Sequence, residues 1–352
     1  MNSRERTARA LRGERTDRTP LAYLFLGGAR HVLGRLGARM RAVYRDAERI
    51  AEAQAVAAEM FGHDTGMVPW GCLTVEAEAF GCRLEWEEDY YPQIVGRPLE
   101  AKRDLSLLAD PDPGQSARMP LVLEGLTRLR RRAGDDLFIV ATVVSPFLVA
   151  AELRGMIGLL SDFIADPPFV EALFDRLTEG TARYLRAILR TGACDAILFE
   201  NAGACRELMG PHHVNRFLMP VESRLLAMAR REAPEVFLIE HNCSKTPYFR
   251  ELLDLDVDAV SVGHGEIGAL AGRAPQGPAA VGARERPIAW IGNVDNTRTL
   301  LEGTPEDVFR EARACIESAG TTPFVLSTRC EIPFKAPLDN IRALARAARG
   351  GS

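Results

Sequence analysis

Residues that could bind a metal ion fall in two short stretches of the sequence. The first is IEHNCS (residues 239–244), which follows an apolar run, and the second is STRCE (residues 327–331), far downstream. In an extended segment alternate side chains point to the same face, so His241 and Cys243 can bind one ion. Imidazole nitrogen and thiolate sulfur together suit Zn²⁺, so the pair is a candidate zinc site.

Cys330, in the second stretch, is the candidate for a third ligand. Three protein ligands would leave zinc an open position for water or substrate, as in catalytic zinc sites. A thiol bound there would lose its proton because the cation stabilises the thiolate, and it would become a nucleophile at neutral pH. The alternative is a buried polar histidine with two unreactive cysteines.

Four further polar residues lie at or just beyond the ends of predicted strands. Glu200 is expected to bond a substrate, to support the metal ligands or to cap the next segment. Asn293 would either bond a ligand or fix a turn. His264 or Glu266 could supply a fourth zinc ligand when no substrate is bound. We therefore take Glu200 and Asn293 as candidate catalytic residues.

The alternation of helices and strands predicts how these residues are held. Strands are predicted at residues 21–26, 65–68, 137–144, 195–200, 236–240, 258–262, 288–291 and 324–327. Predicted helices lie near residues 46–61, 121–132, 149–165, 168–190, 211–231, 247–255 and 305–319. Such alternation predicts a parallel sheet in the α/β class, and eight strands favour a closed (β/α)₈ TIM barrel. The carboxyl ends of its strands would form the catalytic face.

We expect residues 1–349 to form a single domain, because no repeat or linker divides the chain. A basic amphipathic helix near residues 3–13 would extend the barrel at its N-terminus, and residues 71–100 alternate like an inserted hairpin. Residues 271–282, rich in Gly, Pro and Ala, predict a surface loop. The tail, residues 350–352, is expected to be disordered.

The composition is that of a soluble globular protein, with 352 residues, 47% hydrophobic and 26% charged. A net charge of −4 predicts no general attraction to nucleic acid or to anionic membranes. The N-terminal residues are too charged for a signal peptide, and the most apolar window is shorter than the roughly 20 residues of a membrane helix. Seven scattered cysteines then indicate reduced thiols and a cytoplasmic protein.

A glycine pattern raises a different possibility. GHGEIG (residues 263–268) satisfies G-x-G-x-x-G after a predicted strand, as in dinucleotide-binding proteins. Pro275 and Pro278 follow soon afterwards and leave little helix to hold a pyrophosphate. A loop at the rim of the barrel is the favoured interpretation.

Several segments follow one another in an order typical of a known family. They are Arg4-Glu5-Arg6, Asp17-Arg18-Thr19-Pro20, Gly81-Cys82, Ser145-Pro146-Phe147, Met209-Gly210-Pro211, His241-Asn242-Cys243, Ile291-Gly292-Asn293-Val294-Asp295, Gly303-Thr304-Pro305 and Cys330-Glu331-Ile332-Pro333. With them the chain resembles the uroporphyrinogen decarboxylase superfamily over nearly its whole length. The His-x-Cys pair and the distant cysteine resemble its zinc-dependent methylcobamide:thiol (coenzyme M type) methyltransferases.

The resemblance implies a barrel with zinc on His241, Cys243 and Cys330. It implies an enzyme in which a zinc-activated thiolate accepts a methyl group from a methyl-corrinoid or a related donor. Asp-x-His-x-x-Gly, a corrinoid-binding motif, does not occur in the chain, so methylcobalamin or another methyl-corrinoid would arrive free or on a separate protein. A small-molecule thiol is the other expected partner, and the family suggests a homodimer.

The sequence departs from the methyltransferase branch at two positions near the site. Ser244 stands where the family usually has glycine after His-x-Cys. Gly263 stands where these methyltransferases often carry a glutamate that binds zinc, and His264 and Glu266 lie beside it. The resemblance therefore leaves the fourth zinc ligand open.

Two other functions remain compatible with the sequence. The arginine-rich signature of true uroporphyrinogen decarboxylases is absent after Pro20. A metal-independent decarboxylase or lyase could still bind a polycarboxylate through arginines such as Arg30 and Arg35. The third possibility is a non-catalytic corrinoid- or metal-binding barrel.

Overall fold

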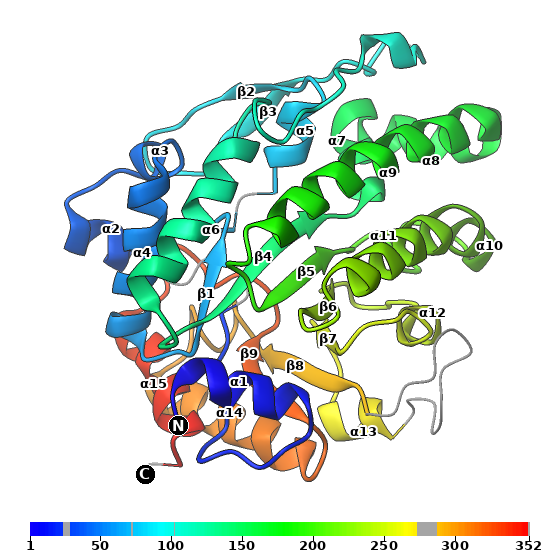
Figure 1. Ribbon diagram of the computed structural model, residues 1–352. Helices are drawn as coiled ribbons and strands as arrows, with labels where there is room; N and C mark the ends of the chain where they lie inside the picture. Colours follow the sequence, from blue (N-terminus) through cyan, green and yellow to red (C-terminus); the bar gives the residue numbers. More distant parts are fainter. Residues whose placement is uncertain (24–28, 72, 102, 273–286, 351–352) are drawn as a thin grey trace.

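The wall of the protein is a curled sheet of parallel strands (Figure 1). The computed structural model describes residues 1–23, 29–71, 73–101, 103–272 and 287–350. Within these residues seven strands lie in the order β1-β4-β5-β6-β7-β8-β9. Their bounds are β1 Thr65–Val68, β4 Phe138–Val144, β5 Ala196–Glu200, β6 Phe237–Asn242, β7 Ala259–Val262, β8 Ala289–Val294 and β9 Phe324–Thr328.

Residues 20–23 close the gap between the two edges of this sheet. On one side Ala22 N donates to Leu326 O (2.9 Å) and Leu326 N donates to Pro20 O (3.0 Å). On the other side Asp64 N donates to Leu21 O (2.8 Å). In the described part of the strand predicted at residues 21–26, residues 21–23, only Leu21 forms a bridge, because Tyr23 N bonds the Thr65 hydroxyl in place of a backbone carbonyl. Residues 24–26 lie outside the described part of the chain.

Asp64, just before β1, holds this closing segment in place. Its buried carboxylate accepts hydrogen bonds from both Nη atoms of Arg18 (2.8 Å each) and from Nη1 of Arg6 (2.7 Å). It also accepts from the Ser3 hydroxyl and from Leu21 N. A buried charge needs such partners to offset its lost hydration, so the N-terminal helix and the closing segment depend on this carboxylate.

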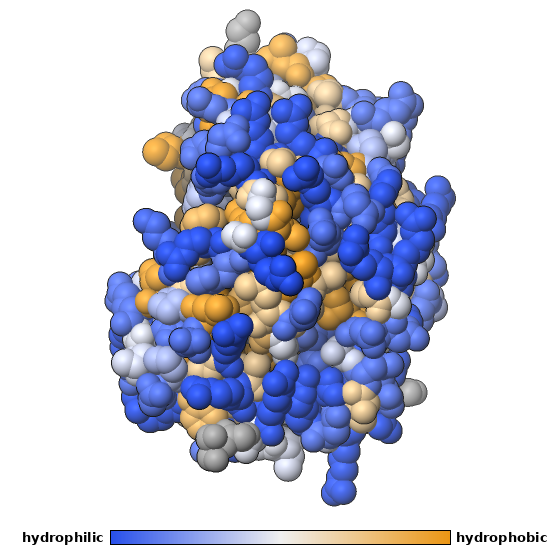
Figure 2. Space-filling view, turned by 90° about the vertical axis from the view of Figure 1, so that its left-hand side faces the viewer, coloured by the Kyte–Doolittle hydropathy of each residue, from blue (hydrophilic) through white to orange (hydrophobic). Residues whose placement is uncertain are grey.

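Helices surround the sheet (Figure 1). Their bounds are α1 Ser3–Leu11, α2 Ala29–Leu36, α3 Met40–Val43, α4 Ala47–Phe61, α5 Val75–Ala79, α6 Met119–Ala133, α7 Pro146–Arg154, α8 Met156–Ala165, α9 Pro167–Arg190, α10 Pro211–His213, α11 Met219–Glu232, α12 Phe249–Leu253, α13 Ile267–Ala271, α14 Pro305–Ala319 and α15 Leu338–Ala348. Figure 2 shows the side that carries α2 and α4, where hydrophilic side chains cover most of the surface.

Two predicted elements differ from the structure in detail. The helix expected near residues 149–165 is two helices, α7 and α8, because Gly155 between them has a φ of 81° that ends the first. The expected hairpin insertion exists as β2 Arg83–Glu85 and β3 Gln93–Gly96, preceded by the short helix α5. Most of the loop expected at residues 271–282 and the tail beyond residue 350 lie outside the described residues.

The interior of the barrel is filled from alternate strand positions. Its apolar cluster contains Met67, Phe138, Val140, Ala196, Leu198, Phe237, Ile239, Ala259, Ala289, Ile291 and Val325, closed below by Ala10 and Leu11 of α1. Side chains alternate along a strand, so the next inward positions beyond Leu198 and Ile239 belong to Glu200 and His241. The apolar filling thus ends where the candidate site begins.

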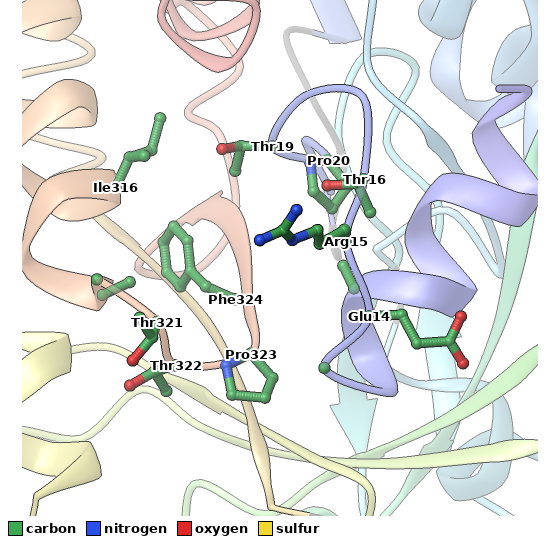
Figure 3. A pocket seen from close by; sticks show the side chains of 14 residues that line it. Glu14, Arg15, Thr16, Thr19, Pro20, Ile316, Thr321, Thr322, Pro323 and Phe324 are labelled. Atoms are coloured by element: carbon green, nitrogen blue, oxygen red, sulfur yellow. The ribbon is translucent and has the colours of Figure 1, made fainter.

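A pocket of about 380 Å³ lies at the opposite end of the barrel (Figure 3). The loop after α1 and the turn between α14 and β9 line it, with Arg15, Thr19 and Phe324 among its side chains. In a barrel of this kind the amino ends of the strands serve stability. None of the candidate site residues lines this pocket. Among the described helices, none is long and apolar enough to cross a membrane.

Asp64→Asn should destabilise the protein by about 3–5 kcal/mol, because it removes the charge that compensates the buried guanidinium of Arg6. Urea unfolding measures the change. Asp17→Asn is the matched control: Asp17 also pairs with Arg6, but its side chain is 43% exposed, so the cost should stay below about 1 kcal/mol. Equal effects of the two substitutions would contradict the role given to Asp64.

Candidate metal centre

Three side chains converge at the carboxyl end of the barrel. The ligand atoms of His241, Cys243 and Cys330 all lie within 4.8 Å of one another. His241 is on β6, Cys243 follows that strand directly, and Cys330 lies two residues beyond β9. His241 is 1% exposed and both cysteines are partly buried. The structure therefore brings together the three residues that the sequence predicted as metal ligands.

The register of neighbouring strands orients His241. Parallel pairing places Glu200 of β5 opposite His241, and His241 opposite Ser261 of β7. His241 Nδ1 lies 2.9 Å from Ser261 Oγ, and Nε2 lies 3.7 Å from Glu200 Oε2. A hydrogen bond at one ring nitrogen fixes the ring and directs the other nitrogen toward a metal. Ser261 therefore aims Nε2 at the space beside the cysteines.

The two cysteines share a hydrogen bond that makes them unequal. The Cys330 thiol donates to Cys243, and together with His241 this bond lowers the pKa of Cys243 to about 4. The same bond, with burial, raises the pKa of Cys330. Burial lowers the pKa of His241, but Glu200 and Cys243 together raise it above its ordinary value. The surroundings of Cys243 thus favour its thiolate, the form that binds a soft cation.

Glu200 places a second negative group beside this cluster. Its side chain is 4% exposed, and burial, followed by the repulsion from Cys243, raises its pKa to about 7 against the opposing effect of His241. Its Oε2 atom accepts no hydrogen bond within the described part of the chain. A nitrogen, two sulfurs and a carboxylate oxygen are all groups that bind zinc, so the residues present fit such an ion.

Asn242, between His241 and Cys243, faces away from the barrel and anchors the neighbouring loop. Its Nδ2 donates to Asn201 O (2.8 Å) and Ala204 O (3.2 Å). Its Oδ1 accepts from both the backbone N and the hydroxyl of Ser244. The serine that departs from the family pattern therefore stabilises the turn after Cys243.

The residues after β7 do not join the cluster. A Cβ atom on Gly263 would lie 2.6 Å from Cys243 O and 2.7 Å from its Cα, so no side chain fits there. His264 is only partly buried; burial, then Arg329 and Lys245, lower its pKa. Glu266 turns away, and its Oε1 accepts from the Ser318 hydroxyl (3.2 Å). Neither His264 nor Glu266 belongs to the three-residue group.

Asn293 uses its amide within the protein. Its Nδ2 donates to Gly265 O (2.7 Å), and its Oδ1 lies 3.7 Å from Cys315 Sγ. These contacts fix the turn after β7 against α14, which was one of the two roles expected from the sequence. A catalytic role for Asn293 stays a prediction.

The inserted hairpin reaches the neighbour of Cys330 through Tyr91. The Tyr91 hydroxyl donates to Glu331, the residue after Cys330, and burial raises the pKa of that carboxyl to about 7. Sequence reasoning did not assign a role to this contact or to Ser261. The alternation of β7 could have indicated Ser261, because this residue is the last inward-facing position of the strand. No sequence pattern could have indicated the Tyr91 contact, because it joins residues 240 positions apart.

Comparison with known proteins places this geometry in a family. The family model described as Uroporphyrinogen decarboxylase (URO-D) matches residues 2–350. The chain belongs to this family. It is 27% identical over 340 residues to the methylcobamide:CoM methyltransferase MtaA of Methanosarcina barkeri, covering 96% of this chain and 95% of that protein. It is also 26% identical over 356 residues to the uroporphyrinogen decarboxylase of Anaeromyxobacter dehalogenans, covering 96% of each.

Among solved structures, a methyltransferase from Methanosarcina mazei matches this URO-D family member with a TM-score of 0.86. The two chains are 25% identical, and the match covers 99% of this chain and 98% of the other. The comparisons confirm the predicted family and its methyltransferase branch. They also confirm the α/β TIM-barrel fold and support an enzyme of the methyltransferase type.

In the metal-free protein Cys243 should react with iodoacetamide at a rate that is nearly constant from about pH 5.5 to 8, because its lowered pKa keeps it a thiolate throughout. The rate should fall only toward pH 4, as the thiolate is protonated. Peptide mass spectrometry identifies the modified residue. Cys194, whose pKa burial raises to about 12, is the internal control that should remain unmodified.

Cys330→Ala removes the thiol that donates to Cys243, so the pKa of Cys243 should rise and its reaction at pH 6 should slow. A Cys243 rate that climbs steadily up to pH 8 in the unsubstituted protein would show an ordinary thiol and would contradict the hydrogen-bonded pair.

Proposed function

We propose that the protein is a zinc-dependent methyltransferase in which a thiol accepts a methyl group from a methyl-corrinoid. The observation that carries this proposal is the convergence of His241, Cys243 and Cys330 at the mouth of the barrel. The relative named a methylcobamide:CoM methyltransferase supports a corrinoid donor and a thiol acceptor. The donor would be free methylcobalamin or a separate corrinoid protein, and the acceptor a small-molecule thiol.

In this proposal His241, Cys243 and Cys330 hold Zn²⁺. The ion, when bound, supplies the positive charge that keeps an acceptor thiol deprotonated at neutral pH. Ser261 holds the ring direction of His241, and Asn242 fixes the loop beside Cys243. Glu200 lies beside His241 within the metal centre. Asn293 holds the turn after β7, which borders the centre.

In this proposal residues 1–349 form one catalytic domain. The inserted hairpin borders the site through Tyr91, and residues 20–23 close the barrel between β1 and β9. The six described cysteines are free thiols, which fits the cytoplasmic location proposed for the enzyme.

Methyl transfer tests the proposal directly. Purified protein is incubated anaerobically with methylcobalamin and each member of a panel of thiols, including coenzyme M and homocysteine. The expected result is a thiol-dependent change from the methyl-cobalt to the cob(I)alamin spectrum, with the matching methyl thioether formed. Removal of zinc by a chelator should abolish the reaction, and added zinc should restore it.

The cysteine ligands provide the variants for this assay. Cys243→Ser and Cys330→Ser should each lose zinc and at least about 100-fold in rate, since even second-shell changes cost about 10–100-fold. Cys194→Ala, a buried cysteine away from the site, is the control that should keep both. Metal-free native protein that decarboxylates a polycarboxylate, or corrinoid binding without transfer to any thiol, would overturn the proposal.

Ser261→Ala should weaken zinc binding by about 10–100-fold, because His241 loses the partner that fixes its ring. Competition with a chromophoric chelator measures the affinity. Ser106→Ala is the control, since the Ser106 hydroxyl bonds the exposed Asp104 side chain, away from the cluster. An unchanged affinity in Ser261→Ala would show that the hydrogen bond does not orient the histidine.

A further inference from the structure

We propose that Glu200 is the fourth protein ligand of the metal centre. This inference rests on the proposed function, because it concerns the same ion. It assigns the remaining position to β5, where the branch resemblance places a glutamate at the end of β7. The ligand set would then be one histidine, two cysteines and one glutamate drawn from β5, β6 and the end of β9.

The end of β7 cannot supply the ligand in this chain. Gly263 lies against the backbone of Cys243, and a Cβ there would be within 2.8 Å of three of its atoms. Real Cβ atoms do not approach a backbone so closely, so any side chain at residue 263 would displace Cys243 itself. The close contact that places Cys243 thus excludes a ligand at the neighbouring position.

The two nearby alternatives are also engaged elsewhere or solvent-exposed. Glu266 accepts a hydrogen bond from Ser318 on α14, and His264 is only partly buried among Lys245 and Arg329. Neither offers an atom to the group of His241, Cys243 and Cys330. Glu200, in contrast, faces the barrel interior at the same register level as His241.

The position of Glu200 Oε2 matches that of a metal ligand. It lies 3.7 Å from His241 Nε2. Two ligand atoms bound at about 2.0–2.2 Å in a tetrahedron are about 3.4 Å apart, close to this separation. Glu200 is not within the mutual 4.8 Å of all three other residues, so binding would draw its carboxylate toward the sulfurs.

The energetics of the carboxylate point the same way. Glu200 is 3% exposed, and its Oε2 accepts no hydrogen bond from any described residue. A buried oxygen that accepts no hydrogen bond loses its hydration, which costs about 1–3 kcal/mol or more for a charged group. Among the described residues only the imidazole of His241, 3.7 Å away, offsets part of this cost. A cation bound between Glu200, His241 and the two cysteines would provide the missing interaction.

A crystal structure of the zinc-loaded protein without added thiol tests the assignment. We expect Glu200 Oε2 within about 2.2 Å of zinc, together with His241 Nε2 and both sulfurs. Zinc held by those three residues with water or His264 in the fourth position, and with Glu200 beyond bonding distance, would overturn this inference alone. Absence of zinc from all three would instead overturn the proposed function.

Glu200→Gln gives a second test that does not use activity. Its zinc affinity should fall by more than about 100-fold in chelator competition, beyond the roughly 10–100-fold loss expected when a residue only supports a ligand. Glu266→Gln removes a carboxylate from the loop after β7 and should retain the affinity of the unsubstituted protein. An unchanged affinity in Glu200→Gln would overturn the assignment.

Thermal unfolding of the metal-free proteins separates a ligand from a structural carboxylate. Metal-free Glu200→Gln should melt at the same or a higher temperature, because the substitution removes a buried carboxylate whose Oε2 accepts no hydrogen bond from the described residues. With zinc bound, the same variant should melt below the unsubstituted protein, since weaker binding contributes less stability. A lower melting temperature of the variant without zinc would show that Glu200 stabilises the fold and would contradict the inference.

Discussion

The curvature of the sheet is the constraint on which the metal centre depends. Strands β6 and β9 are separated by β7 and β8, so in a flat sheet three steps of about 4.8 Å would keep them about 14 Å apart. The sulfurs of Cys243 and Cys330 nevertheless lie within 4.8 Å of each other. Closure by residues 20–23, held by Asp64 on the opposite end of the barrel, brings them together.

The same packing gathers two sulfurs and a carboxylate that a bound cation would stabilise. Two sulfurs that share one proton and a buried carboxylate surround one imidazole, which has little solvent to stabilise it. Such an arrangement costs folding energy unless an ion is bound, and it is common at functional sites rather than in structural cores. If the cluster binds a metal as proposed, binding and the stability of the barrel mouth would therefore be linked.

The fold and most of the candidate ligand residues could be predicted from the sequence for simple physical reasons. Helix and strand alternation predicted the barrel, and the two-residue period of a strand placed His241 and Cys243 on one face. The relation of Glu200 to His241 required the register of two strands, which no local pattern contains. The sequence also did not show that only Leu21 of residues 21–23 pairs as a strand, because the apolar run after Pro20 carries no sign of where pairing stops. The need for glycine at residue 263 follows only from the backbone of Cys243 packed against it.

Zinc K-edge X-ray absorption on protein purified without chelator tests the central claim most directly. The account predicts about one zinc per chain, with two sulfurs at about 2.3 Å and two nitrogen or oxygen atoms at about 2.0–2.2 Å. The sulfur contribution should fall to one in Cys330→Ser that has been reloaded with zinc. A native protein without zinc, or zinc with no sulfur neighbour, would contradict the account.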